Sequence, residues 1–117
     1  MTVALIRKQL KEELALLEKE ISNILEKPNI LSEQVRCLIA DIDRCYILLD
    51  RFEEFCKDFS YYFALRKGLC SSLIILTIAL EAFEVGAIDL TSLKSATEKS
   101  NAKKSIEKTI EKLDESP

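Results

Sequence analysis

The sequence predicts an all-α fold, an elongated helical bundle built on one long central helix at about residues 33–66 that carries a heptad repeat. The 117 residues include only two glycines and two prolines, whereas an all-β or doubly wound fold needs turn-forming residues about every ten positions. Apolar residues also recur at steps of three and four, the spacing of one face of an α-helix. We expect antiparallel helical hairpins and a marginal helix at the C-terminus.

The first helix is expected at about residues 3–26. Its apolar residues recur on one face, at Ile6, Leu10, Leu14, Leu17, Ile21 and Ile24. Pro28 and Asn29 end this helix, because proline lacks the backbone N–H that a helix interior needs. Ser32 is a suitable N-cap for a second helix, which is therefore expected to begin at about residue 33.

The strongest pattern in the sequence lies in the second, central helix. Nine apolar residues follow one another along this helix, and the spacing between them alternates between three and four positions: Val35, Leu38, Ile42, Cys45, Leu49, Phe52, Cys56, Phe59 and Phe63. This spacing is the a and d pattern of a heptad repeat. Because no strong helix breaker precedes Gly68, we expect one continuous helix over about residues 33–66, roughly 51 Å long.

A third helix is expected between Gly68 and Gly86, and Gly86 is a suitable C-cap. Its residues are apolar nearly all round, except for a polar strip of Thr77, Glu81 and Glu84. A helix of this kind must be buried on most of its sides. We assign residues 1–93 to one helical bundle domain.

Residues 94–117 are expected to form a charged C-terminal tail or a weak helix. Their only large apolar residues are Ile106, Ile110 and Leu113. Ser95 followed by Glu98 matches a capping box, which favours a helix at about residues 96–114 that is marginal when alone. We expect this segment to contribute little to the stability of the fold.

The unequal lengths of these helices predict that the chain binds a partner. Antiparallel hairpins leave both ends of the 33–66 helix short of neighbours and leave the third helix partly uncovered. The missing burial amounts to several large side chains at ~1.5 to 3 kcal/mol each. We therefore expect a homo-oligomer or an obligate complex with another protein. The alternative is a break at about residues 58–60, which gives a compact four-helix monomer.

The residue types argue against catalysis. Histidine, the commonest general acid–base residue and metal ligand, is absent. The four cysteines are too widely spaced for zinc-binding CxxC pairs; Cys45 and Cys56 fall at core heptad positions, and Cys37 falls outside them. The carboxylates of the central helix alternate with arginine and lysine, as on the solvated side of a coiled coil. We predict no catalytic residue, no cofactor and no metal site.

Charge and hydropathy bear on partners and location. A formal net charge of -3 gives the chain as a whole no attraction to nucleic acid or anionic lipid. Arg7 and Lys8 stand where a signal peptide needs an apolar stretch. The longest uncharged run, at residues 69–80, is shorter than the ~20 residues of a membrane-spanning helix. We expect a cytoplasmic protein that binds neither nucleic acid nor a membrane.

These features favour a non-enzymatic helical module for protein–protein interaction, which acts by helix–helix packing as an adaptor, assembly subunit, small chaperone or inhibitor. A candidate partner-binding stripe lies on the outer side of the central helix, where tyrosine and arginine suit a binding hot spot. Its residues are Arg44, Ile47, Arg51, Phe59, Tyr61 and Tyr62. Two alternatives stay open: a helical subunit of a nucleoprotein complex, and a bundle enzyme or ligand carrier that uses carboxylates of the central helix.

Overall fold

The computed structural model describes residues 3–55 and 60–115, and every regular element in these ranges is an α-helix. The predicted all-α fold is therefore confirmed. The helices are α1 (Val3–Glu26), α2 (Ser32–Phe55), α3 (Ser60–Glu84), α4 (Leu90–Lys99) and α5 (Ala102–Glu115).

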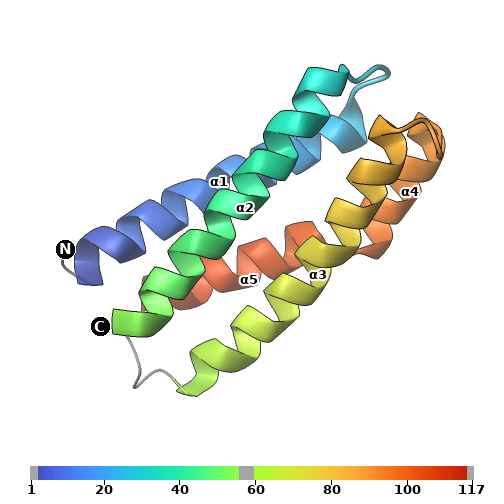
Figure 1. Cartoon of the computed structure of the whole chain (residues 1–117). Coiled ribbons are helices and arrows are strands. Elements are labelled where there is room, and N and C mark those ends of the chain that lie inside the picture. The colour runs from blue at the N-terminus through green and yellow to red at the C-terminus, as the bar shows by residue number, and fades with distance from the viewer. Residues whose placement is uncertain (1–2, 56–59, 116–117) are drawn as a thin grey trace.

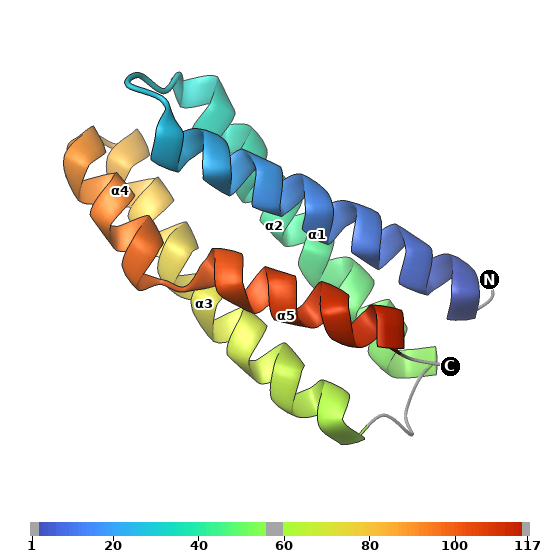
Figure 2. The same ribbon diagram turned by 180° about the vertical axis from the view of Figure 1, so that it is seen from behind.

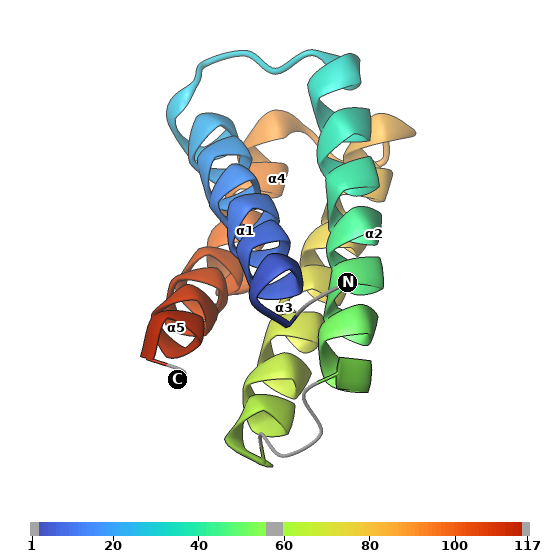
Figure 3. The same ribbon diagram turned by 90° about the vertical axis from the view of Figure 1, so that its left-hand side faces the viewer.

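The helices form a bundle of four antiparallel columns, and α4 and α5 together make the fourth column (Figure 1). Helices α1 and α3 each contact α2, α4 and α5, so they lie diagonally opposite one another. Seen from behind, α5 runs between α1 and α3 (Figure 2). Seen from the side, α2 and α5 flank α1 (Figure 3). The bundle measures 43 × 23 × 20 Å.

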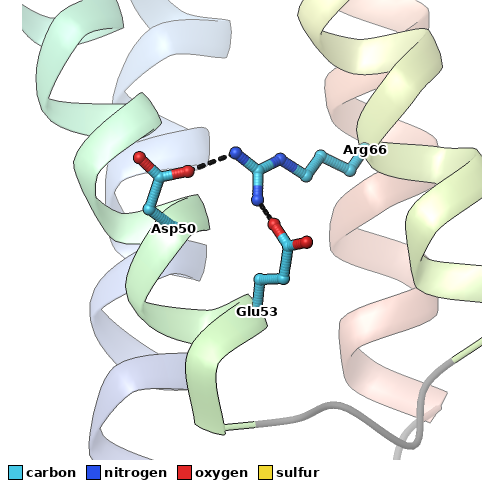
Figure 4. Close-up of polar contacts among 3 residues, drawn as sticks. All are labelled: Asp50, Glu53 and Arg66. Carbon is cyan, nitrogen blue, oxygen red and sulfur yellow. Dashed lines mark hydrogen bonds and ion pairs between the residues drawn. The ribbon is translucent and has the colours of Figure 1, made fainter.

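The single central helix expected over residues 33–66 is not confirmed, because α2 and α3 lie side by side instead of end to end. Arg66 of α3 forms ion pairs with Asp50 and Glu53 of α2 (Figure 4). In one continuous helix, positions 50 and 66 lie roughly 24 Å apart, too far for such contacts. Gly68, the expected start of a helix, lies inside α3, at an exposed position.

The heptad pattern predicts the core positions of α2 correctly but cannot detect the reversal of the chain. Its first six members, Val35, Leu38, Ile42, Cys45, Leu49 and Phe52, are completely buried. A chain that turns back into another helix can keep the same three-and-four spacing, so periodicity alone does not distinguish one long helix from two. The alternative of a compact four-helix chain agrees with these helices; the expected break at 58–60 falls mostly in residues 56–59, outside the described ranges.

The end of α3 and the start of α4 show which local capping signals the sequence carries. At the end of α3, Gly86 has φ +78°, and Ala87 donates a backbone hydrogen bond of 2.8 Å to Ala82, so the predicted glycine C-cap is confirmed. Asp89 is the N-cap of α4, and its side chain accepts a 2.8 Å hydrogen bond from the Ser92 N–H. The expected capping box at Ser95 is wrong, because this residue lies inside α4.

The C-terminal segment packs more extensively than the sequence predicts. Ala102, Ile106 and Leu113 of α5 are buried, and α5 contacts both α1 and α3. Lys11 of α1 forms an ion pair with Asp114. The domain boundary expected at residue 93 falls inside α4.

Buried hydroxyl groups explain how this segment packs with few large apolar residues. Thr97 and Thr109 are almost completely buried, and each donates a hydrogen bond to the carbonyl four residues earlier in its own helix, at 2.7 and 2.8 Å. Because each hydroxyl is satisfied within its helix, its methyl group can face the core without leaving a polar atom unpaired. An estimate that counts only large apolar residues misses this contribution.

We expect Phe52→Ala to lower the free energy of unfolding by about 3 to 5 kcal/mol, because the ring is fully buried. Asp50→Ala should cost no more than about 1 kcal/mol, because the Asp50 side chain is 68% exposed despite its ion pair with Arg66. Chemical denaturation of both variants beside the parent measures the difference. A larger loss for Asp50→Ala contradicts this assignment of core and surface.

We also expect Ile106→Ala to destabilise the chain by about 2 to 5 kcal/mol, since Ile106 is fully buried between α5 and the rest of the bundle. Lys108→Ala, two residues away on the exposed side of α5, is the matched control and should change stability by less than about 0.5 kcal/mol. Equal, small effects in thermal or urea denaturation show that α5 does not dock in solution.

Candidate interaction surfaces

The outer side of α3 carries an exposed, largely aliphatic stripe, here called the α3 face, with the exposed Lys67 and Glu81 one heptad before and after Ile74. The α3 face consists of residues of α3 and of Val85, which directly follows the helix; Ala82 is partly buried and the others are exposed: Ala64, Gly68, Ser71, Ile74, Ile75, Ile78, Ala82 and Val85. Four of these are large and at least half exposed: Ile74 (53%), Ile75 (50%), Ile78 (63%) and Val85 (79%). The opposite side of the helix is buried in the bundle through Leu69, Leu73, Leu76 and Leu80.

The exposure of several large aliphatic side chains on α3 is unusual for a surface helix. A surface helix normally turns its charged residues to water and its aliphatic residues to the core. Here Glu81 and Glu84 lie beside α2, where they border a groove with Arg36 and Ile39, and Thr77 donates a hydrogen bond to the Leu73 carbonyl. Val85 lines the same groove, and Glu81 and Glu84 are both exposed, so the isoleucine side chains share the solvent-facing side of α3 with these two charges.

The α3 face is the surface that the sequence analysis missed. A helix that is apolar nearly all round predicts extensive burial, and that expectation holds for the inner side of α3. Which side the chain itself covers depends on where α2, α4 and α5 lie, and periodicity does not contain this information. The available signal was the heptad-like spacing of Ile75, Ile78, Ala82 and Val85.

A second surface is the groove between α1 and α2, here called the α1–α2 groove, with a volume of about 540 Å³. It brings together three residues of the predicted stripe, Arg44, Ile47 and Arg51, with Leu16 of α1. Ile47 is 54% exposed, as expected for an outward position. Of the other predicted residues, Phe59 and the side chains of Tyr61 and Tyr62 lie outside the described part of the chain.

Three carboxyl groups of α1 and α2 interact with one another, and they include Asp41, one of the carboxylates considered above for a bundle enzyme. Glu13 and Asp41 are both nearly buried, and Arg44 Nη2 lies 2.9 Å from Asp41 Oδ1. Burial, followed by repulsion from Asp41, raises the pKa of Glu13. Burial raises the pKa of Glu20 to about 8, and a hydrogen bond with Asp41 adds to this shift. Protonated Glu20 can therefore share its proton with Asp41.

This carboxyl cluster supplies little further chemistry. Within residues 3–55 and 60–115, no group of three histidine, cysteine, aspartate or glutamate side chains is arranged to hold a metal ion. Arg44 offsets part of the negative charge around Asp41. The arrangement can hold a proton between two carboxyl groups, which makes it sensitive to pH.

Cys37 and Cys45 occupy the environments that their heptad positions predict. Cys45 is buried, and burial raises the pKa of its thiol to about 12, so the reactive thiolate is suppressed near neutral pH. Cys37 is exposed and free, and it borders a pocket of about 250 Å³ with Ile24 and Leu31. Cys56 lies outside the described residues.

Comparison with protein-family models, with curated proteins and with solved structures finds no match to this chain. The surfaces of the bundle are therefore interpreted from their geometry alone. In the described part of the chain, no helix combines the length and hydrophobicity that crossing a bilayer requires.

The raised pKa of Glu20 predicts that the chain loses stability as the pH rises. Below its ordinary pKa near 4.5, Glu20 is protonated in both the folded and the unfolded chain. Between that value and about 8, only the folded chain keeps the proton, so the free energy of unfolding falls over this range. Glu20→Gln should flatten this decline in urea denaturation between these two pH values.

The matched control for this experiment is Glu26→Gln, which changes an exposed carboxylate on the same helix. This variant should keep the slope of the parent. If Glu20→Gln and Glu26→Gln show the same pH dependence, Glu20 does not hold a proton in the folded chain at neutral pH.

Proposed function

We propose that this chain is a non-enzymatic helical module for protein–protein interaction, which binds a partner by packing a helix against the α3 face. One observation carries the proposal: Ile74, Ile75 and Ile78 on one side of α3, and Val85 directly after its last residue, are each at least half exposed. Burial of apolar surface stabilises a complex by about 25 cal/mol per Å². A contiguous aliphatic patch on an otherwise charged protein is typical of an interaction site.

The spacing of the α3 face favours a helical partner. Steps of three and four along Ile75, Ile78, Ala82 and Val85 give the ridge that another helix can flank by knobs-into-holes packing. Ser71 and Gly68 extend this ridge with small side chains, which allow close approach of a second backbone. A coiled-coil-like contact therefore fits the surface better than an extended peptide, which binds to sheet edges.

The α1–α2 groove is a second candidate surface for the same function. Ile47 and Leu16 supply exposed aliphatic area, and Arg44 and Arg51 supply polar contacts at its rim. Its apolar area is divided between two helices and interrupted by Glu12 and Glu13. The α3 face has four large aliphatic side chains that are at least half exposed, whereas the groove has Ile47 and Leu16, so we rank the α3 face first.

The remaining interpretations stay proposals of lower rank. An enzyme or ligand carrier needs a polar pocket, and the carboxyl cluster of Glu13, Glu20 and Asp41 is the feature of the described residues that supports this interpretation. A nucleoprotein subunit needs phosphate contacts, for which the net charge of -3 offers no general attraction. A cytoplasmic location is favoured by the free thiols of Cys37, Cys45 and Cys70.

The test compares substitutions of two isoleucines that are both more than half exposed and lie on different surfaces, Ile78 (63%) and Ile47 (54%). Tagged full-length chain is cross-linked in its host cell, and the attached proteins, a second copy included, are identified by mass spectrometry. Ile78→Glu should abolish the cross-link, because a carboxylate in an apolar contact must be desolvated. Ile47→Glu, the matched control, should retain it.

Circular dichroism of both variants checks that they fold. Loss of the cross-link only in Ile47→Glu transfers the proposal to the α1–α2 groove. Cross-links that neither substitution affects contradict a function based on either surface.

A further inference from the structure

We infer that the partner of the α3 face is a second copy of this chain, packed antiparallel about a two-fold axis between Ile74 and Ile75. This inference rests on the proposed function and names the partner. Helix α3 already contacts α2, α4 and α5 of its own chain, so the α3 face is the side left for an intermolecular contact.

The distribution of side-chain sizes along the α3 face favours an antiparallel pair of identical helices. The first half of the face carries small residues, Ala64, Gly68 and Ser71, and the second half carries Ile78 and Val85. Reversing one copy about this axis places Ala64 of each helix opposite Val85 of the other copy, and Ser71 opposite Ile78. A parallel pair places glycine opposite glycine and valine opposite valine, which leaves a gap at one end.

The charges that border the face favour the same arrangement. Lys67 is exposed in the first half of α3, and Glu81 is exposed in the second half. They are separated by two heptads, so they lie on the same side of the stripe, each roughly 10 Å along the helix from Ile74. In the antiparallel pair, Lys67 of each copy therefore lies level with Glu81 of the other. A parallel pair brings Lys67 against Lys67.

The neighbouring cation does not disturb this pairing. Arg66 forms ion pairs with Asp50 and Glu53 of its own chain, so its guanidinium is directed to α2 and away from the α3 face (Figure 4). A two-fold contact uses the same face once in each copy. The assembly therefore stops at a dimer.

The experiment is sedimentation velocity of the purified full-length chain from about 1 to about 100 μM, a range in which a reversible dimer shows a concentration-dependent mass. The parent chain should dimerise, and Ile78→Glu should be monomeric throughout. Ile47→Glu has a substitution of the same kind at an exposed isoleucine outside the face, and it should dimerise like the parent.

A charge exchange tests the antiparallel orientation. Lys67→Glu should raise the dissociation constant by about tenfold, because two attractive contacts become repulsive by symmetry. Adding Glu81→Lys to the same chain restores opposite charges at both contacts, so the double variant should return to within about threefold of the parent. In a parallel dimer, Lys67→Glu only replaces one like-charge pair with another and leaves the constant unchanged.

Four results overturn the inference: a parent chain that stays monomeric, a dimer that persists in Ile78→Glu, a dissociation constant that Lys67→Glu leaves unchanged, or a double variant as weak as Lys67→Glu. The proposed function fails separately. If the parent is monomeric but an Ile78-dependent cross-link to a different protein appears in cells, the α3 face binds that protein and only the inference is wrong. If no such cross-link appears either, both are wrong.

Discussion

The reversal of direction between α2 and α3 divides the chain into helices of matched length, and the packing of the other helices depends on this match. Helices α1, α2 and α3 have 24, 24 and 25 residues. The fourth column is made of α4 and α5, which have 10 and 14 residues, so their combined length matches that of each of the other three helices. Each column can therefore bury one side along its whole length, which a single helix over residues 33–66 could not do with shorter neighbours.

Much of the interior could be predicted from the sequence because it depends on local periodicity. All six residues expected on the inner face of α1 are buried, and so are the first six heptad residues of α2. The glycine at the end of α3 has the left-handed conformation that its C-cap position predicts. Such features depend only on residues a few positions apart along the chain, so the local sequence is sufficient to predict them.

The sequence-based predictions that differ from the structure concern features that depend on contacts between distant parts of the chain. The pairing of Arg66 with Asp50 brings together residues that a continuous helix separates, and nothing in the heptad pattern distinguishes the two cases. The weak helix expected at the C-terminus packs through Thr97 and Thr109, whose burial depends on hydroxyl groups satisfied within their own helices. For the candidate site, the outward position of Ile47 was predicted, but its neighbour Leu16 comes from α1. The α3 face could not be located before the positions of α2, α4 and α5 were known.

The break between α4 and α5 has a consequence for local unfolding. Asn101 has φ 59°, and the Ala102 N–H bonds to the Ser100 hydroxyl at 3.1 Å instead of continuing the helix of α4. The backbone hydrogen bonds of α5 therefore form a separate cooperative unit, or foldon, that can open while α4 stays closed. Opening this unit removes Ile106 from the core and uncovers the inner side of α3. Amide protons of α5 can thus exchange with solvent through a smaller fluctuation than global unfolding.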